Sequence, residues 1–111
     1  MSDMAKYRSR YIKSEELKRT GDQTREITGY GEASLRDPKT NGSVIKPVLE
    51  FDDRALVLNA TLLDFLFEAF KSTDGDDWIG HQVEIYFDPS VKFGNDTRGG
   101  IRLRLPESEI F

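Results

Sequence analysis

The pattern of apolar residues along this chain changes its period at one place, and this change most constrains the fold. In the stretch TLLDFLFEAFK, from Thr61 to Lys71, polar residues recur every three or four positions among apolar ones. This spacing predicts a helix of about three turns that is buried on almost every side. On both sides of it the chain has short apolar or alternating stretches, which predict β-strands. We therefore expect a mainly β protein with this helix in its centre.

Five strand-like stretches surround the predicted helix, in the order strand, strand, strand, helix, strand, strand. They are residues 24–35, 44–51, 55–59, 81–87 and 101–105. Gly29 and Gly31 lie inside the first stretch, where glycine often marks a bulge or a sharp coil of the strand. This order predicts a five-stranded OB-like Greek-key barrel with one helix between strands three and four. An α+β sheet with the helix packed on one face remains the alternative.

The length of 111 residues fits one domain with short extensions. We expect a flexible basic arm at residues 1–13, one OB-like domain at residues 14–105, and an acidic tail at residues 106–111 that ends in Phe. No apolar run in the sequence has the length of a signal peptide or a membrane span. A cytoplasmic protein without a membrane partner is therefore expected.

The composition argues against enzyme chemistry. The chain has no cysteine and one histidine, His81, so thiol nucleophiles, thiolate metal sites and sites built on two imidazoles are excluded. Motifs for a nucleophile elbow or a phosphate-binding glycine loop are missing from the sequence. The acidic cluster of Asp74, Asp76 and Asp77 lacks the ligand spacing of a calcium loop, which indicates a solvated loop. We expect no catalysis, no metal and no cofactor.

The net charge of −4 argues at first against a nucleic-acid partner, because a protein that binds nucleic acid usually has a basic surface. The charge is, however, unevenly distributed along the chain. Residues 51–81 hold seven acidic residues and two basic ones, whereas residues 1–19 hold six basic residues and three acidic ones. This distribution predicts a polarised molecule with one basic face.

An OB-fold binds oligonucleotides with one strand face and two long loops, which correspond to residues 36–43 and 88–100 of this chain. Binding of a single strand requires cations along the phosphates and exposed rings for stacking. Such residues lie in both loops and on the neighbouring strands, although mixed charge with occasional tyrosine is also typical of ordinary solvated strands. The candidate nucleic-acid-binding residues are Arg36, Lys39, Lys46, Lys92, Phe93, Arg98, Arg102, Arg104, Tyr30 and Tyr86.

The last six residues, PESEIF, place two acids before a terminal aromatic residue. This segment resembles the acidic tails, ending in an aromatic residue, with which bacterial and phage single-stranded-DNA-binding proteins recruit partner enzymes. In those tails the terminal ring fills a pocket and the acids contact basic residues of the partner. The resemblance implies that Glu107, Glu109, Ile110 and Phe111 bind a replication or recombination protein.

Five short motifs follow one another with spacings that resemble a family of short, mostly uncharacterised proteins of tailed bacteriophages and prophages. The matching residues are Lys46–Val48, Leu56–Asn59, Asp77–Gly80, Phe93–Gly94 and Gly100–Arg102. The resemblance covers residues 44–104 and implies a phage origin and a place in the host-cell cytoplasm. It adds no catalytic residue.

Together these observations predict a phage-encoded, non-catalytic protein that binds single-stranded DNA, or RNA, in replication or recombination. The sequence is compatible with a homo-oligomer. One alternative is a protein-binding module that inhibits a host enzyme through the acidic segment 51–77, which would present DNA-like charge. Another is a component of the virion.

Overall fold

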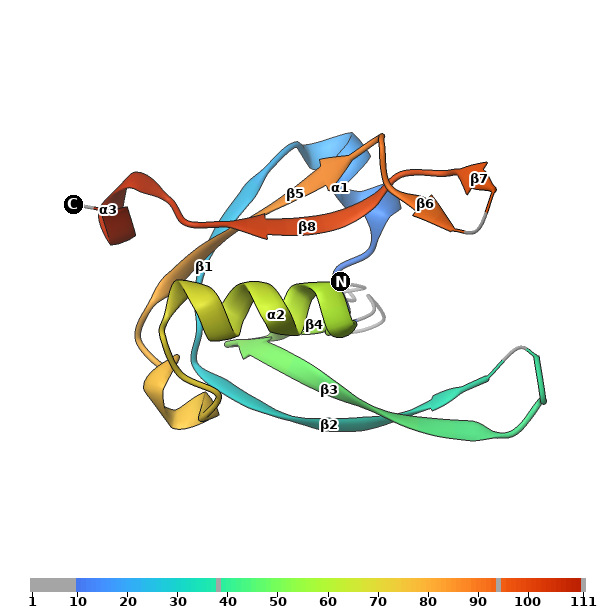
Figure 1. The fold of residues 1–111 in the computed structure, drawn as a ribbon, viewed down its shortest axis with the longest axis horizontal. Helices are drawn as coiled ribbons and strands as arrows, with labels where there is room; N and C mark the ends of the chain where they lie inside the picture. Colours follow the sequence, from blue (N-terminus) through green and yellow to red (C-terminus); the bar gives the residue numbers. More distant parts are fainter. Residues whose placement is uncertain (1–9, 38, 94, 111) are drawn as a thin grey trace, which may run out of the picture.

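The computed structural model describes residues 10–37, 39–93 and 95–110, and only the backbone of Phe93, Asp96 and Ile110. It confirms a mainly β protein (Figure 1). In chain order the elements are α1 (Ser14–Thr20), β1 (Gln23–Glu26), β2 (Gly29–Arg36), β3 (Ser43–Phe51), β4 (Arg54–Val57), α2 (Ala60–Ala69), the 3₁₀ turn η2 (Gly75–Asp77), β5 (Gln82–Asp88), β6 (Lys92–Phe93), β7 (Asp96–Thr97), β8 (Gly100–Arg104) and α3 (Glu107–Ile110).

The first predicted strand is divided into β1 and β2, which belong to different sheets. β1 pairs with β5 in a sheet of order β1-β5-β8, and β2 pairs with β3 in a sheet of order β2-β3-β4. All of these pairings are antiparallel. The bend between the two halves is fixed from both sides, because Ile27 N–H donates to the His81 carbonyl at 2.8 Å and Thr28 N–H donates to the Glu50 carbonyl at 2.9 Å. The predicted coil in this strand thus transfers the chain from one sheet to the other.

The two sheets do not close into a barrel, so the predicted five-stranded OB barrel is not confirmed. No strand pairing joins β4 to β8 in the described part of the chain. The outer edge of β4 is instead paired with residues 10–12: Ala55 N–H donates to the Arg10 carbonyl at 2.7 Å, and Ile12 N–H donates to the Ala55 carbonyl at 2.9 Å. These residues belong to the predicted basic arm, whose first nine residues lie outside the described part. Their pairing occupies the edge that β8 would need.

The core lies between the two sheets and α2. Leu49, Leu56, Val83 and Ile85 are buried from the two sheets, and Leu66 is buried from α2. Fully burying one such side chain contributes about 1.5–3 kcal/mol. Because the sheets remain open beside α2, most other apolar side chains of this helix are only half-buried. The prediction of a helix buried on almost every side therefore holds for part of its surface.

The end of α2 gives a first testable prediction. Lys71 follows the helix in the left-handed conformation, with φ 55°, and Ser72 N–H donates to the Phe67 carbonyl at 3.1 Å, as in a Schellman motif. Gly75, the first glycine after the helix in the sequence, does not take this position, because it starts η2. Glycine adopts positive φ without the steric cost of a Cβ. Lys71→Gly should therefore raise the free energy of unfolding by about 0.5–1 kcal/mol.

Urea denaturation measures this gain, and Lys71→Ala is the matched control. Alanine also removes the charged side chain but keeps the Cβ, so its free energy of unfolding should stay near that of the unchanged protein. Equal effects of the two substitutions would contradict the assignment of backbone strain to Lys71.

Candidate nucleic-acid interface

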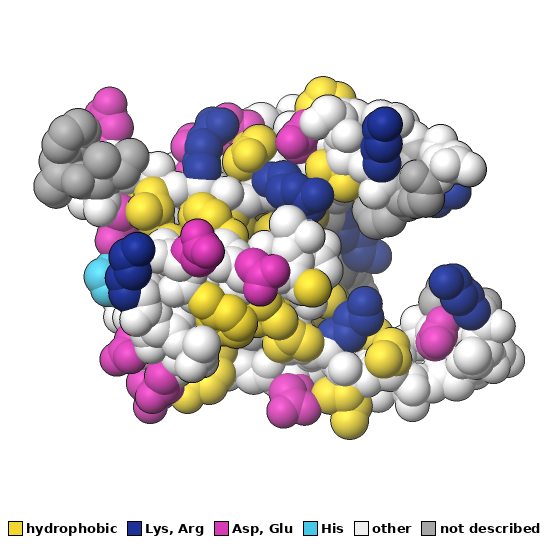
Figure 2. Space-filling model, viewed as in Figure 1, with side chains coloured by type: hydrophobic (Ala, Val, Ile, Leu, Met, Phe, Trp, Pro, Cys, Tyr) yellow, Lys and Arg dark blue, Asp and Glu magenta, His cyan; other side chains and the backbone are white. Residues whose placement is uncertain are grey.

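A cleft opens between the β2–β3 hairpin and the β6–β7 hairpin, which project on the same side of the molecule (Figure 1). It consists of three adjoining pockets of about 480, 650 and 460 Å³, all of which include Val57 of β4. Leu35 of β2 and Ile101 of β8 complete an apolar floor around Val57. Figure 2 shows the hollow between the two hairpins. The cleft therefore lies where β4 and β8 remain apart.

The rims of the cleft are strongly basic. Among the described residues, eight basic ones line its three pockets, against two acidic ones, Glu15 and Asp37. Of the 14 basic residues that lie in the described part of the chain, more than half are thus found here. The basic residues are Lys13, Lys18, Arg36, Lys39, Lys46, Lys92, Arg98 and Arg102.

The acidic residues of segment 51–81 lie elsewhere. Asp64 and Glu68 are exposed on α2, and Asp74, Asp76 and Asp77 are exposed around η2. In Figure 2 acidic side chains lie over α2 and towards the end of the molecule that carries η2, while basic side chains gather around the cleft. This separation matches the polarised surface expected from the charge distribution in the sequence.

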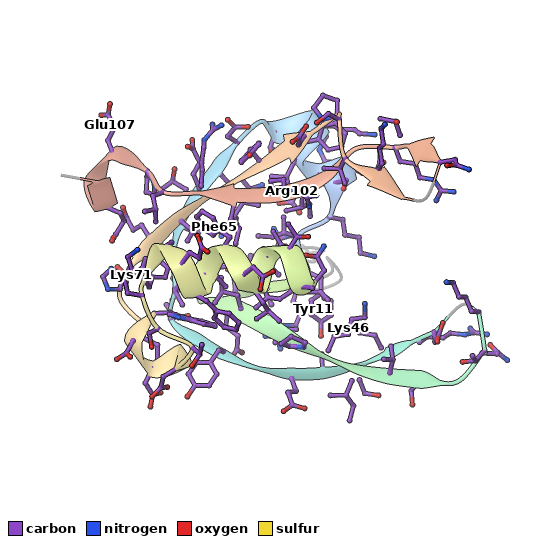
Figure 3. The ribbon with its side chains drawn as sticks, viewed as in Figure 1. Tyr11, Lys46, Phe65, Lys71, Arg102 and Glu107 are labelled. Carbon is purple, nitrogen blue, oxygen red and sulfur yellow. The ribbon has the colours of Figure 1, made fainter. Side chains whose placement is uncertain are left out.

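Six of the predicted nucleic-acid-binding residues come together in this cleft. On one side β3 carries Lys46, cross-strand from Ala33, and the hairpin tip carries Arg36 and Lys39. The Arg36 Nε–H donates to Asn41 Oδ1 at 2.9 Å, which holds its guanidinium at the rim. The opposite side contributes Lys92, Arg98 and Arg102. Figure 3 shows Lys46 and Arg102 on different strands, with Lys71 and Glu107 towards the other end of the molecule.

Three further predicted residues lie away from the cleft. The Arg104 guanidinium donates to Glu84 and to Asp22, each at 2.6 Å, and lies 4.5 Å from the centre of the Tyr86 ring. Arg104 therefore has its charge matched within the protein, and its hydrogen bond holds the pKa of Glu84 below its usual value. The Tyr30 hydroxyl donates to Asp76 at 2.7 Å, which raises the pKa of Tyr30. The side chain of Phe93 lies outside the described residues.

Three cleft residues that precede β1 are not among the binding residues predicted from the sequence. Tyr11 and Lys13 line the pocket beside β4, and Lys18 of α1 lines the pocket beside β8. Tyr11 and Lys13 belong to residues 1–13, the predicted flexible basic arm, and Lys18 follows it. Nothing in the sequence spacing of this arm indicated that the chain returns to the edge of β4.

The C-terminal tail is partly bound to its own domain. Gln82 N–H donates to Glu109 Oε2 at 2.9 Å, and His81 Nδ1 lies 2.7 Å from Glu109 Oε1. These contacts, with that from His81 first, lower the pKa of Glu109. Glu107 is exposed, whereas the Ile110 side chain and Phe111 lie outside the described residues. Of the predicted partner-binding carboxylates, Glu107 therefore faces solvent and Glu109 contacts β5.

The described residues contain no helix with the length and apolar character of a membrane span. No group of three or more acidic or histidine side chains in that part of the chain is arranged to hold a metal ion. Comparison with protein-family models, curated proteins and solved structures finds no match to this chain.

Proposed function

We propose that this protein binds single-stranded nucleic acid in the cleft between the β2–β3 and β6–β7 hairpins, as a non-catalytic phage protein of replication or recombination. One observation carries the proposal: in the described part of the chain, eight basic residues and two acidic residues surround an apolar floor. A basic groove that follows the phosphates, with an apolar surface for the bases, is the arrangement that single strands require.

The proposed architecture is an OB-like barrel that is held open. Its strand order supports this, because the first strand pairs with both the second and the fourth, and the helix follows the third. Only the pairing between β4 and β8 is needed to complete the barrel, and the edge of β4 is occupied by residues 10–12. The two hairpins that flank the cleft correspond to the two binding loops of an OB-fold.

The arrangement of charge and apolar surface determines which nucleic acid fits. Cations on both hairpins face the space between them, so one strand can place its phosphates along the rims. Its bases can then rest on Leu35, Val57 and Ile101. In a duplex the faces of the bases are already stacked on their neighbours. We therefore expect preference for single strands, with little dependence on base sequence.

Fluorescence anisotropy of a labelled oligo-dT strand of about 15 nucleotides tests the proposal, with the same strand in a duplex as a comparison. The dissociation constant should be micromolar or tighter at low salt and should increase at least tenfold at moderate salt. The duplex should bind more weakly than the single strand. Absence of binding at low salt would overturn the proposal, and a labelled oligo-rU strand compares RNA with DNA.

A further inference from the structure

Residues 10–13, which we call the strap, form the third wall of the cleft. Tyr11 and Lys13 of the strap line the pocket that also contains Val57 and Ile101. The strap runs extended beside β4 and is joined to it at Ala55 by two backbone hydrogen bonds. Its position therefore determines how far the strap side chains lie from the opposite wall of the cleft.

Arg54 of β4 connects the strap to the rest of the fold. Only 6% of this residue is exposed. Its Nε–H donates to the Arg10 carbonyl at 3.2 Å, and one of its NH₂ groups donates to the Tyr11 carbonyl at 3.4 Å. The two NH₂ groups also contact the carboxylate of Glu16 in α1, one of them at 3.0 Å. One guanidinium thus holds the strap and α1 against β4.

The geometry of these contacts requires arginine. A guanidinium presents several donors in one plane, whereas the ammonium of lysine is a compact point charge that cannot span the same acceptors. Glu16 is further oriented by Gln23, whose side-chain NH₂ donates to Glu16 Oε2 at 2.8 Å. Loss of these Arg54 contacts would leave the Arg10 and Tyr11 carbonyls without their side-chain donor. This would hold even if the neighbouring apolar side chains of Ile12 and Leu17 stay buried.

We propose that Arg54 is a positioning residue for nucleic-acid binding, which holds Tyr11 and Lys13 of the strap at the cleft. Tyr11 then stacks on a base and Lys13 contacts a phosphate, which adds a third wall to the two hairpins. This inference rests on the proposed function. It goes further by assigning a binding role to residues that precede the first strand and a positioning role to a buried arginine.

A double-mutant cycle between Arg54 and Tyr11 tests this inference. The dissociation constant for oligo-dT is measured for the unchanged protein, Arg54→Lys, Tyr11→Ala and the double variant. Tyr11→Ala should weaken binding about tenfold through the loss of one stacking contact. Arg54→Lys should weaken binding at least as much, because it displaces Lys13 as well as Tyr11, and the double variant should be little worse than Arg54→Lys alone. Amide exchange of residues 11–13 should become faster in Arg54→Lys.

Val83→Ala is the control for a general loss of stability, because Val83 is buried in β5 and does not line the cleft. This variant should be less stable and yet bind oligo-dT within about twofold of the unchanged protein. If Arg54→Lys does not fold, Glu16→Gln replaces it in the same cycle. Additive effects of Tyr11→Ala and Arg54→Lys on the free energy of oligo-dT binding would overturn the inference and leave the proposed function intact. Unchanged affinity in Arg54→Lys would do the same. Absence of oligo-dT binding by the unchanged protein would overturn both.

Discussion

Replacing both Lys46 and Lys92 with glutamate is expected to weaken binding of single-stranded DNA by about a hundredfold or more at low salt. The two lysines lie on opposite sides of the cleft and are both exposed. A lysine that neutralises a phosphate releases bound counterions, which favours binding. A glutamate in its place loses this contribution and also repels the phosphate that the lysine would contact. Both lysines are exposed and lie outside the buried core, so the fold should persist.

The matched control reverses two basic residues that do not line the cleft. Arg19→Glu with Lys71→Glu changes the net charge by the same amount, and neither side chain contributes to the three pockets. We expect this variant to bind within a few-fold of the unchanged protein. Equal losses in the two double variants would mean that the overall charge, rather than the cleft, governs binding.

Acidification is expected to remove a contribution to stability on the order of 3 kcal/mol through Glu16. Its hydrogen bond from Arg54 lowers the pKa of Glu16 from 4.5 to about 2, against an opposing effect of burial. The Glu16 side chain is 16% exposed, so solvent screens this pair little. A carboxyl group with a lowered pKa in the folded state adds stability above its unfolded pKa. This contribution is therefore present above about pH 4.5 and is lost as the pH falls towards 2.

Thermal or urea unfolding between pH 7 and pH 2 measures this loss. Glu16→Gln should already lack the contribution at pH 7 and should show a weaker dependence on pH below 5. Glu15→Gln is the matched control on the same helix, because Glu15 is largely exposed and its ion pair with Lys18 lies at the surface. An unchanged pH profile in Glu16→Gln would show that the pair with Arg54 does not link stability to pH.

The strands and the central helix could be predicted because their signals are local. Alternation in residues 81–87 and 101–105 corresponds to β5 and β8, and the change of period at Thr61 corresponds to α2. The separation of the two sheets could not be predicted in the same way. It depends on the contact between residues 10–12 and Ala55, which are far apart in the sequence, and no periodic pattern marks that pairing.

The candidate site was likewise predictable where its signals are local. Residues 36–43 and 88–100 were identified as the two binding loops from their turn residues and length, and their basic residues do line one cleft. Alternation indicates which side of a strand a residue occupies but not which neighbour it meets. Arg104 was therefore grouped with Arg102, although Glu84 and Asp22 bind its guanidinium. The position of Tyr11 in the cleft could not be predicted, because it depends on the long-range pairing with Ala55.

The salt dependence of oligo-dT binding tests the central claim most directly, because it counts the phosphates that the cleft neutralises. For a single strand, each phosphate contact contributes about −0.7 to the slope of the logarithm of the association constant against the logarithm of the salt concentration. With contacts from five to seven of the cleft cations, we predict a slope between about −3 and −5. The variant with both Lys46→Glu and Lys92→Glu should have a shallower slope. A slope near zero for the unchanged protein would contradict a basic cleft that binds the phosphate backbone.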